Sequence, residues 1–125
     1  MKNNIYEFIE TYLTDNIHIR NDFFENLRIE NNKDIVIIDL FYCYHLLKRG
    51  SKKKAHLLFK SIKENQGNKS LYLMLKAIIY FHEDTDNCKK LLLESIYFNK
   101  ENKWSYLELF YLLKELPQEL EGKHS

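Results

Sequence analysis

Apolar side chains recur every third or fourth residue along most of this chain of 125 residues, and that spacing is typical of α-helices. Five residues near the N-terminus show it most clearly, at positions i, i+3, i+4, i+7 and i+8: Ile5, Phe8, Ile9, Tyr12 and Leu13. The chain has only three Gly and one Pro, too few for the turns of a β-sandwich or a barrel. The sequence therefore predicts an all-α fold.

Breaks in the apolar pattern divide the chain into about seven expected helices. The secondary structure of residues 34–49 is the most difficult to assign, because residues 35–38 are β-branched and could begin a buried strand. The apolar run continues to Leu47 without Gly or Pro, which is too long for a strand and predicts a central, buried helix. Pro117 is expected to end the last helix. The expected helices span residues 4–14, 19–30, 34–49, 52–65, 70–82, 86–99 and 103–115.

The chain length predicts one domain, and a repeat of 34 residues lies within it. This shift aligns Leu57, Leu58, Ser61 and Ile62 with Leu91, Leu92, Ser95 and Ile96, and Tyr72, Leu73 and Leu75 with Tyr106, Leu107 and Leu109. It also places the small residue Cys43 over the small residue Ala77. A repeat of this length predicts helical hairpins of one design.

The repeat resembles the tetratricopeptide repeat family, which places a small residue where its two helices cross, as Cys43 and Ala77 do. The second unit departs from that pattern, with Lys89 where Ala is expected and Leu93 where an aromatic residue is expected. The resemblance implies antiparallel helical hairpins stacked as an α-solenoid, and a closed helical bundle is the alternative. The expected parts of the single domain 1–125 are a degenerate hairpin at 1–31, repeat hairpins at 34–67 and 68–101, a terminal helix at 102–116 and a polar tail at 117–125.

No motif for catalysis or for a cofactor occurs in the chain. It lacks HExxH, GxSxG, GxGxxG and the P-loop, and the loop from His82 to Asp86 lacks the spacing of a calcium loop. Cys43 and His45 are two residues apart and so point to different faces of a helix. Asp39 interrupts the most apolar helix and, if buried, needs an Arg or Tyr partner. We therefore expect no enzyme, no catalytic residue, no metal and no cofactor.

The cellular setting follows from the cysteines and from the lack of long apolar runs. Cys43 and Cys88 have neither metal-binding nor redox spacing and are expected to be buried, reduced thiols, with one disulfide as the alternative. There is no run of about 18 apolar residues, and the N-terminus does not read as a signal peptide. A cytoplasmic protein that does not enter a membrane is expected.

Charge is distributed unevenly, although the net charge is only +1. Residues 1–47 carry four basic and eight acidic side chains. Residues 48–63 carry seven basic side chains and no acidic one, and residues 64–125 carry eight basic and ten acidic side chains. The resulting basic patch comprises Lys52, Lys53, Lys54, Lys60 and Lys63. It fits a solvated helix face, an acidic protein or, less well at this net charge, nucleic acid.

The pattern as a whole predicts a non-catalytic protein–protein interaction module, for example a toxin-neutralising immunity protein that binds a toxin domain, or a small adaptor. The alternative is a nucleic-acid-binding or regulatory protein that uses the basic band 48–63. The sequence leaves the oligomeric state open. If the register of the repeat family carries over, six residues face the concave binding surface: Tyr44, Lys48, Met74, Ile78, His82 and Glu108.

Overall fold

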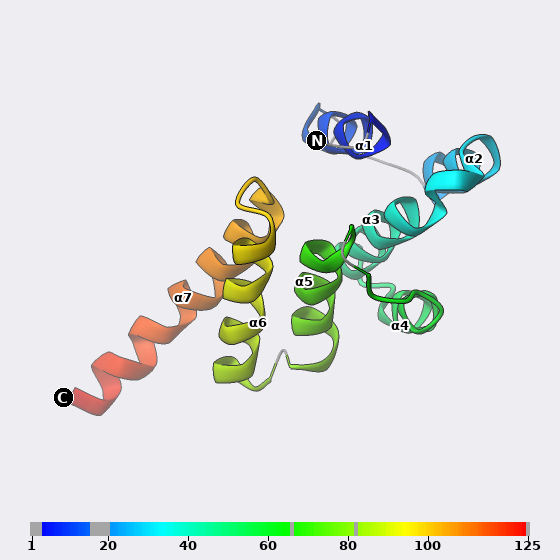
Figure 1. Ribbon diagram of the computed structural model, residues 1–125. Coiled ribbons are helices and arrows are strands. Elements are labelled where there is room, and N and C mark those ends of the chain that lie inside the picture. The colour runs from blue at the N-terminus through cyan, green and yellow to red at the C-terminus, as the bar shows by residue number, and fades with distance from the viewer. Residues whose placement is uncertain (1–3, 16–20, 66, 82, 125) are drawn as a thin grey trace. The chain divides into compact units, whose positions relative to one another are not determined.

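The computed structural model describes residues 4–15, 21–65, 67–81 and 83–124, and it describes side chains at all of these except 4, 14, 15, 21 and 115–124. The described residues form helices and no strand, which confirms the all-α prediction (Figure 1). The elements are α1 Asn4–Asp15, α2 Asn21–Glu30, the 3-10 helix η1 Asn32–Asp34, α3 Ile35–Lys48, α4 Lys52–Lys60, α5 Lys69–Tyr80, α6 Thr85–Phe98 and α7 Lys103–His124.

The β-branched stretch at 35–38 forms the first turn of α3, as predicted, and not a strand. All nine residues from Ile38 to Leu46 are buried, so this helix has no polar face. A helix that is apolar on every side is stable only when other elements surround it. Helix α3 accordingly lies at the centre of its part of the molecule.

The helices fall into two compact units, Met1–Lys63 and Glu64–Ser125. In the first unit α1, α2 and α4 all pack on α3. Aromatic rings fill these contacts: Tyr6 meets Phe41 edge-on with ring centroids 5.1 Å apart, and Phe24 stacks on Tyr42 at 5.0 Å. Helices α3 and α4 meet at two small buried residues, where the Cys43 thiol donates a hydrogen bond to the Ala55 carbonyl oxygen at 3.6 Å.

In the second unit α6 contacts both α5 and α7 (Figure 1). Four buried polar residues join the three helices: Ser70, Ser95, Asn102 and Ser105. The hydroxyl oxygens of Ser70 and Ser95 lie 3.1 Å apart, and those of Ser95 and Ser105 lie 2.7 Å apart. Because each buried polar group has a partner, the cluster fixes the close packing of these helices without an unpaired donor.

Two helices, α4 and α7, end far from the positions that the sequence predicts. Helix α4 ends at Lys60 and not at residue 65, and the Ser61 hydroxyl donates to the Leu58 carbonyl oxygen at 2.6 Å. A serine side chain that bonds the backbone in this way competes with continuation of the helix. Helix α7 continues through Pro117 to His124 and does not stop before the proline. Proline removes one backbone hydrogen bond from a helix. The helix can continue through it because the turns on either side keep their own hydrogen bonds.

The described residues contain no helix with both the length and the apolar character that a membrane crossing requires.

Candidate functional site

The residues predicted for a concave face are not all accessible. Tyr44 and Met74 are buried, so neither side chain is open to a partner in this structure. Ile78 and Glu108 are partly exposed, and Lys48 is exposed with its ammonium group 5.3 Å from the Tyr44 ring centroid. His82 lies outside the described residues.

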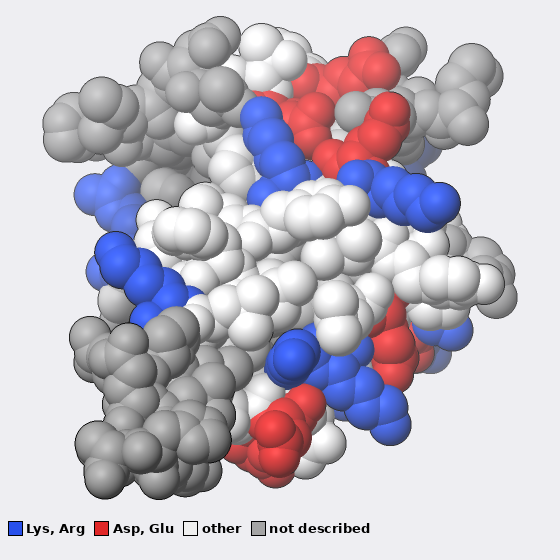
Figure 2. All heavy atoms as spheres, turned by 90° about the vertical axis from the view of Figure 1, so that its left-hand side faces the viewer, with Lys and Arg blue, Asp and Glu red and all other residues white. Residues whose placement is uncertain are grey.

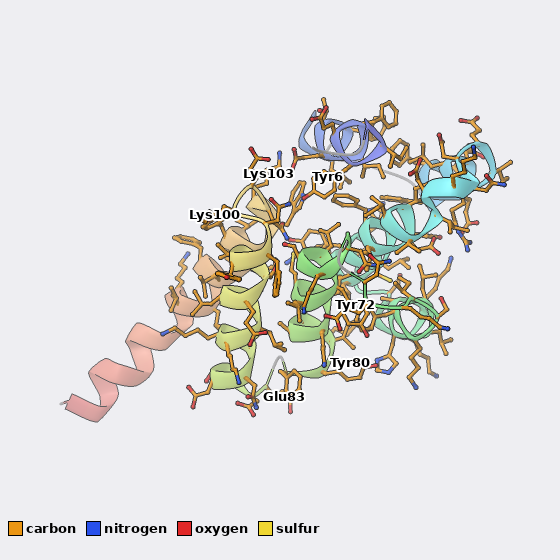
Figure 3. The ribbon with its side chains drawn as sticks, in the orientation of Figure 1. Tyr6, Tyr72, Tyr80, Glu83, Lys100 and Lys103 are labelled. Carbon is orange, nitrogen blue, oxygen red and sulfur yellow. The ribbon has the colours of Figure 1, made fainter. Side chains whose placement is uncertain are left out.

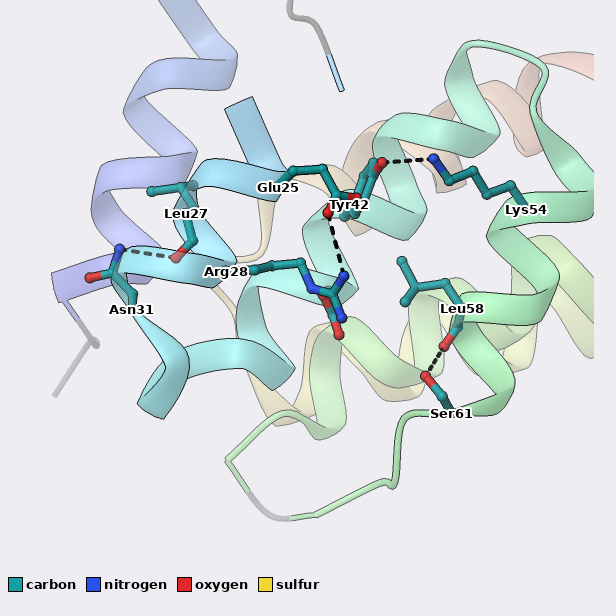
Figure 4. A network of polar contacts seen from close by, with 9 residues as sticks. Glu25, Leu27, Arg28, Asn31, Tyr42, Lys54, Leu58 and Ser61 are labelled. Carbon is teal, nitrogen blue, oxygen red and sulfur yellow. Dashed lines mark hydrogen bonds and ion pairs between the residues drawn. The ribbon is translucent and has the colours of Figure 1, made fainter. Parts of the chain in front are cut away.

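The predicted basic patch lies on and just after α4, where all five of its lysines are exposed. We call Lys52, Lys53, Lys54, Lys60 and Lys63 the α4 basic surface. Lys54 donates a hydrogen bond from Nζ to the Tyr42 hydroxyl at 3.0 Å, a contact that raises the pKa of Lys54 (Figure 4). This hydrogen bond joins Lys54 of the surface to α3.

A second surface, which the sequence analysis did not single out, lies on α6 and α7. Of the twelve large apolar side chains that are exposed in the described part of the chain, eight belong to these two helices. We call these eight the α6–α7 aromatic surface: Leu93, Tyr97, Phe98, Tyr106, Leu107, Phe110, Tyr111 and Leu113. Figure 2 shows a broad area of uncharged side chains with Lys, Arg, Asp and Glu around it.

Helical spacing arranges these residues in rows. Tyr106, Phe110 and Leu113 follow one another at i, i+4 and i+7, which places them on one face of α7. On α6 an open groove of about 420 Å³ follows a similar row. It is lined by Asp86, Lys89, Lys90, Leu93, Glu94 and Tyr97. The row runs from Asp86 to Tyr97, which is roughly 17 Å of helix or about three turns.

The sequence does contain a signal for this surface. The buried side of α6 is made by Cys88, Leu92 and Ser95, and Leu93 and Tyr97 lie off that stripe. An amphipathic helix needs only one apolar stripe to pack on its neighbours. Apolar residues beyond that stripe therefore indicate a second contact surface.

Two buried titratable side chains of α3, Cys43 and His45, have shifted pKa values. Burial raises the pKa of the Cys43 thiol to about 12, with the charge of Asp39 adding to the effect. A thiol that stays protonated is a poor nucleophile. Burial also lowers the pKa of His45 below its ordinary value of 6.5, and Arg49 lowers it further.

We expect neither cysteine to react with a thiol reagent in the folded protein at neutral pH. Both thiols are free and buried, as predicted, and burial also raises the pKa of Cys88. The measurement is the rate of colour release from a disulfide reagent before and after unfolding in urea. Labelling of the folded chain as fast as of the unfolded chain would contradict the buried positions.

Asp39 has the partner that its buried position requires. Its Oδ1 lies 2.9 Å from Nε of Arg28 on α2. Nη1 of Arg28 lies 3.6 Å from Oε2 of Glu25, which is also on α2 (Figure 4). Burial raises the pKa of Asp39 above 3.8, and the Arg28 guanidinium opposes that rise. The pair joins α2 to α3 and is a structural contact.

Nothing in the described part of the chain suggests a metal centre, since no three His, Cys, Asp or Glu side chains there come together in a way that could hold an ion.

Comparison of the chain with protein-family models, with curated proteins and with solved structures finds no match. The two exposed surfaces are the features of the described residues that bear most on function.

Proposed function

We propose that this chain is a non-catalytic protein-binding module, and that the α6–α7 aromatic surface binds an apolar helix face of a partner protein. The supporting observation is the concentration of exposed apolar side chains on two neighbouring helices. Soluble proteins rarely expose large contiguous apolar patches, and those that do use them as contact sites.

The exposed aromatic side chains supply a substantial part of the area that a stable complex needs. Tyr97 is 77% exposed, Phe110 58%, Tyr111 49% and Tyr106 47%. An aromatic side chain buries roughly 200 Å² when fully covered, so these four leave on the order of 450 Å² uncovered. That is about half of the ~800 Å² that each partner contributes to a standard interface.

The shape of the surface favours a helix as the occupant. The groove on α6 is open, follows three turns, and has Leu93 and Tyr97 in its wall with charged groups of both signs beside them. Rows of side chains at this spacing pack against the matching rows of another helix. Aromatic residues would provide most of the affinity, and Lys89, Lys90 and Glu94 would select the partner by charge.

Within this class we favour one dedicated partner, such as a toxin domain that the chain neutralises as an immunity protein, or the client of a small adaptor. A short chain with a large apolar surface and separated charges suits a single tight complex better than many weak ones. We place this activity in the cytoplasm, where Cys43 and Cys88 would stay reduced.

The test measures partner affinity in two surface variants and one matched control. Tyr97→Ala and Phe110→Ala should each weaken binding by about 30-fold, since truncating a central aromatic contact costs ~2 kcal/mol. Ile29→Ala is the control, because Ile29 is also a helical apolar residue, 80% exposed, on α2. All three variants should stay within about 0.5 kcal/mol of the parent in free energy of unfolding.

The partner for this test comes from capture by the tagged full chain, followed by purification and calorimetric titration of the reconstituted pair. A partner that binds the parent and both surface variants equally would contradict the proposal. So would a purified chain that forms a dimer in sedimentation experiments and loses that dimer in Phe110→Ala, because the occupant would then be a second copy.

A further inference from the structure

We propose that the α4 basic surface is a second docking site, independent of the α6–α7 aromatic surface, and that it binds an acidic amphipathic segment of a partner protein. Three features of the first unit support this site: a cationic helix face with an apolar centre, three lysines with no carboxylate beside them among the described residues (Lys52, Lys53 and Lys60), and an acidic composition elsewhere in the unit.

The outer face of α4 combines charge with an apolar contact. Ala55 and Phe59 are the buried residues of the helix and point toward the core. On the other side Lys53, Leu57 and Lys60 follow at i, i+4 and i+7 and are exposed. Leu57 is 67% exposed between the two lysines. A partner that covers this row must offer an apolar side chain as well as negative charge.

Three lysines of α4 have no compensating acid among the residues that the structure describes. Within the described part of the chain, no carboxylate lies within ion-pair distance of Lys52, Lys53 or Lys60. The first turn of α4 carries three lysines and no acidic residue, although the N-terminus of a helix is already positive. The positive potential is therefore left for a binding partner, and an acidic segment would lower the energy of this end of the helix.

The surroundings favour a short acidic segment over a long polyanion. Residues 1–47, in the same unit, carry four basic and eight acidic side chains. A nucleic-acid duplex or an anionic membrane extends well beyond one helix of nine residues and would meet those acids. A peptide segment covers only α4, and beyond about 8 Å the other charges are screened at physiological salt. The apolar side chain of Leu57 adds no affinity for phosphates, whereas it can pack against an apolar side chain of a partner protein.

The experiment titrates the full chain, labelled with nitrogen-15, with a synthetic acidic peptide of about three helical turns whose Glu residues flank a central Leu row. Amide signals of Lys53, Leu57 and Lys60 should shift, and those of α6 and α7 should not. The double variant Lys53→Glu with Lys60→Glu should weaken the peptide affinity by at least about tenfold, and Leu57→Ala by about threefold.

The matched control is Lys100→Glu with Lys114→Glu, the same change of charge at exposed positions of the second unit. Figure 3 shows Lys100 near the turn between α6 and α7. Lys53→Gln with Lys60→Gln tests the loss of charge without reversing it, and circular dichroism checks that each variant keeps its helix content. The control should bind the peptide like the parent.

Several results would overturn the proposal. One is the absence of shifts in α4, and another is an equal loss of affinity in the control variant. A third is tighter binding of a duplex DNA, or of phosphatidylserine vesicles, than of the peptide at the same salt. A duplex result would make this surface a nucleic-acid site, and a vesicle result would make it a membrane contact.

Discussion

Replacing Asn102 by alanine is expected to lower the free energy of unfolding by about 3 kcal/mol. Asn102 is buried and precedes α7, where its Oδ1 accepts a hydrogen bond from the Ser105 amide at 3.2 Å. Its Nδ2 donates to the Ser70 hydroxyl at 2.9 Å. Alanine removes the cap of α7, worth ~1 kcal/mol, and leaves buried groups short of a partner, which costs a further ~2 kcal/mol.

The measurement for Asn102→Ala is urea unfolding followed by circular dichroism and by fluorescence of Trp104, the one tryptophan of the chain. Asn99→Ala is the matched control, because Asn99 also accepts a backbone hydrogen bond, from the Glu101 amide at 3.0 Å, but in an exposed contact. The control should cost less than about 1 kcal/mol. Equal losses in the two variants would show that the buried cluster adds nothing to stability.

Replacing Arg28 by methionine is also expected to cost about 3 kcal/mol at neutral pH, because it leaves the Asp39 carboxylate buried without a cation. Burial already raises the pKa of Asp39, and the guanidinium is the group that lowers it. Without Arg28 the pKa of Asp39 should rise further above 3.8. Asp39 of the folded variant then binds a proton more readily than Asp39 of the unfolded chain. The loss of stability in Arg28→Met is therefore largest at a pH above the pKa of Asp39 in the folded state, and it shrinks as the pH falls through that pKa.

Two further variants separate the contribution of the buried Arg28–Asp39 pair to stability from that of the more exposed Arg28–Glu25 pair. Asp39→Asn in the Arg28→Met background should restore most of the lost stability at neutral pH and remove its dependence on pH. Glu25→Gln breaks only the contact of 3.6 Å between half-exposed groups and should cost less than ~1 kcal/mol. If Arg28→Met costs no more than Glu25→Gln, or if Asp39→Asn gives no rescue, the Arg28–Asp39 pair is not what joins α2 to α3.

The sequence predicts the helices well where the apolar pattern is long. The run from Ile35 to Leu47 outweighs the β-propensity of its first four residues, because burial on every side suits a central helix. The need of Asp39 for a cationic or phenolic partner also follows from its apolar neighbours, and the structure supplies Arg28. These predictions succeed because they depend on residues close together in the sequence.

Predictions that depend on three-dimensional neighbours are less successful. Ser61 and Ser95 align in the repeat, yet Ser61 ends α4 at the surface while Ser95 is buried between α5 and α7. Tyr44 and Met74 were expected to line a groove and are buried. Periodicity identifies the face of a helix, and it does not tell which neighbour covers that face. The stacking of the two hairpins α3–α4 and α5–α6 into a solenoid stays a prediction.

The most direct test of the proposed function is site-specific photo-crosslinking of the full chain in the cells that express it. A benzophenone amino acid replaces Tyr97 on the outer face of α6, and in a second chain it replaces Ile29 on α2. Our account predicts one defined covalent adduct with a different protein from position 97 and none from position 29. The same adducts from both positions, or only an adduct between two copies of this chain, would contradict it.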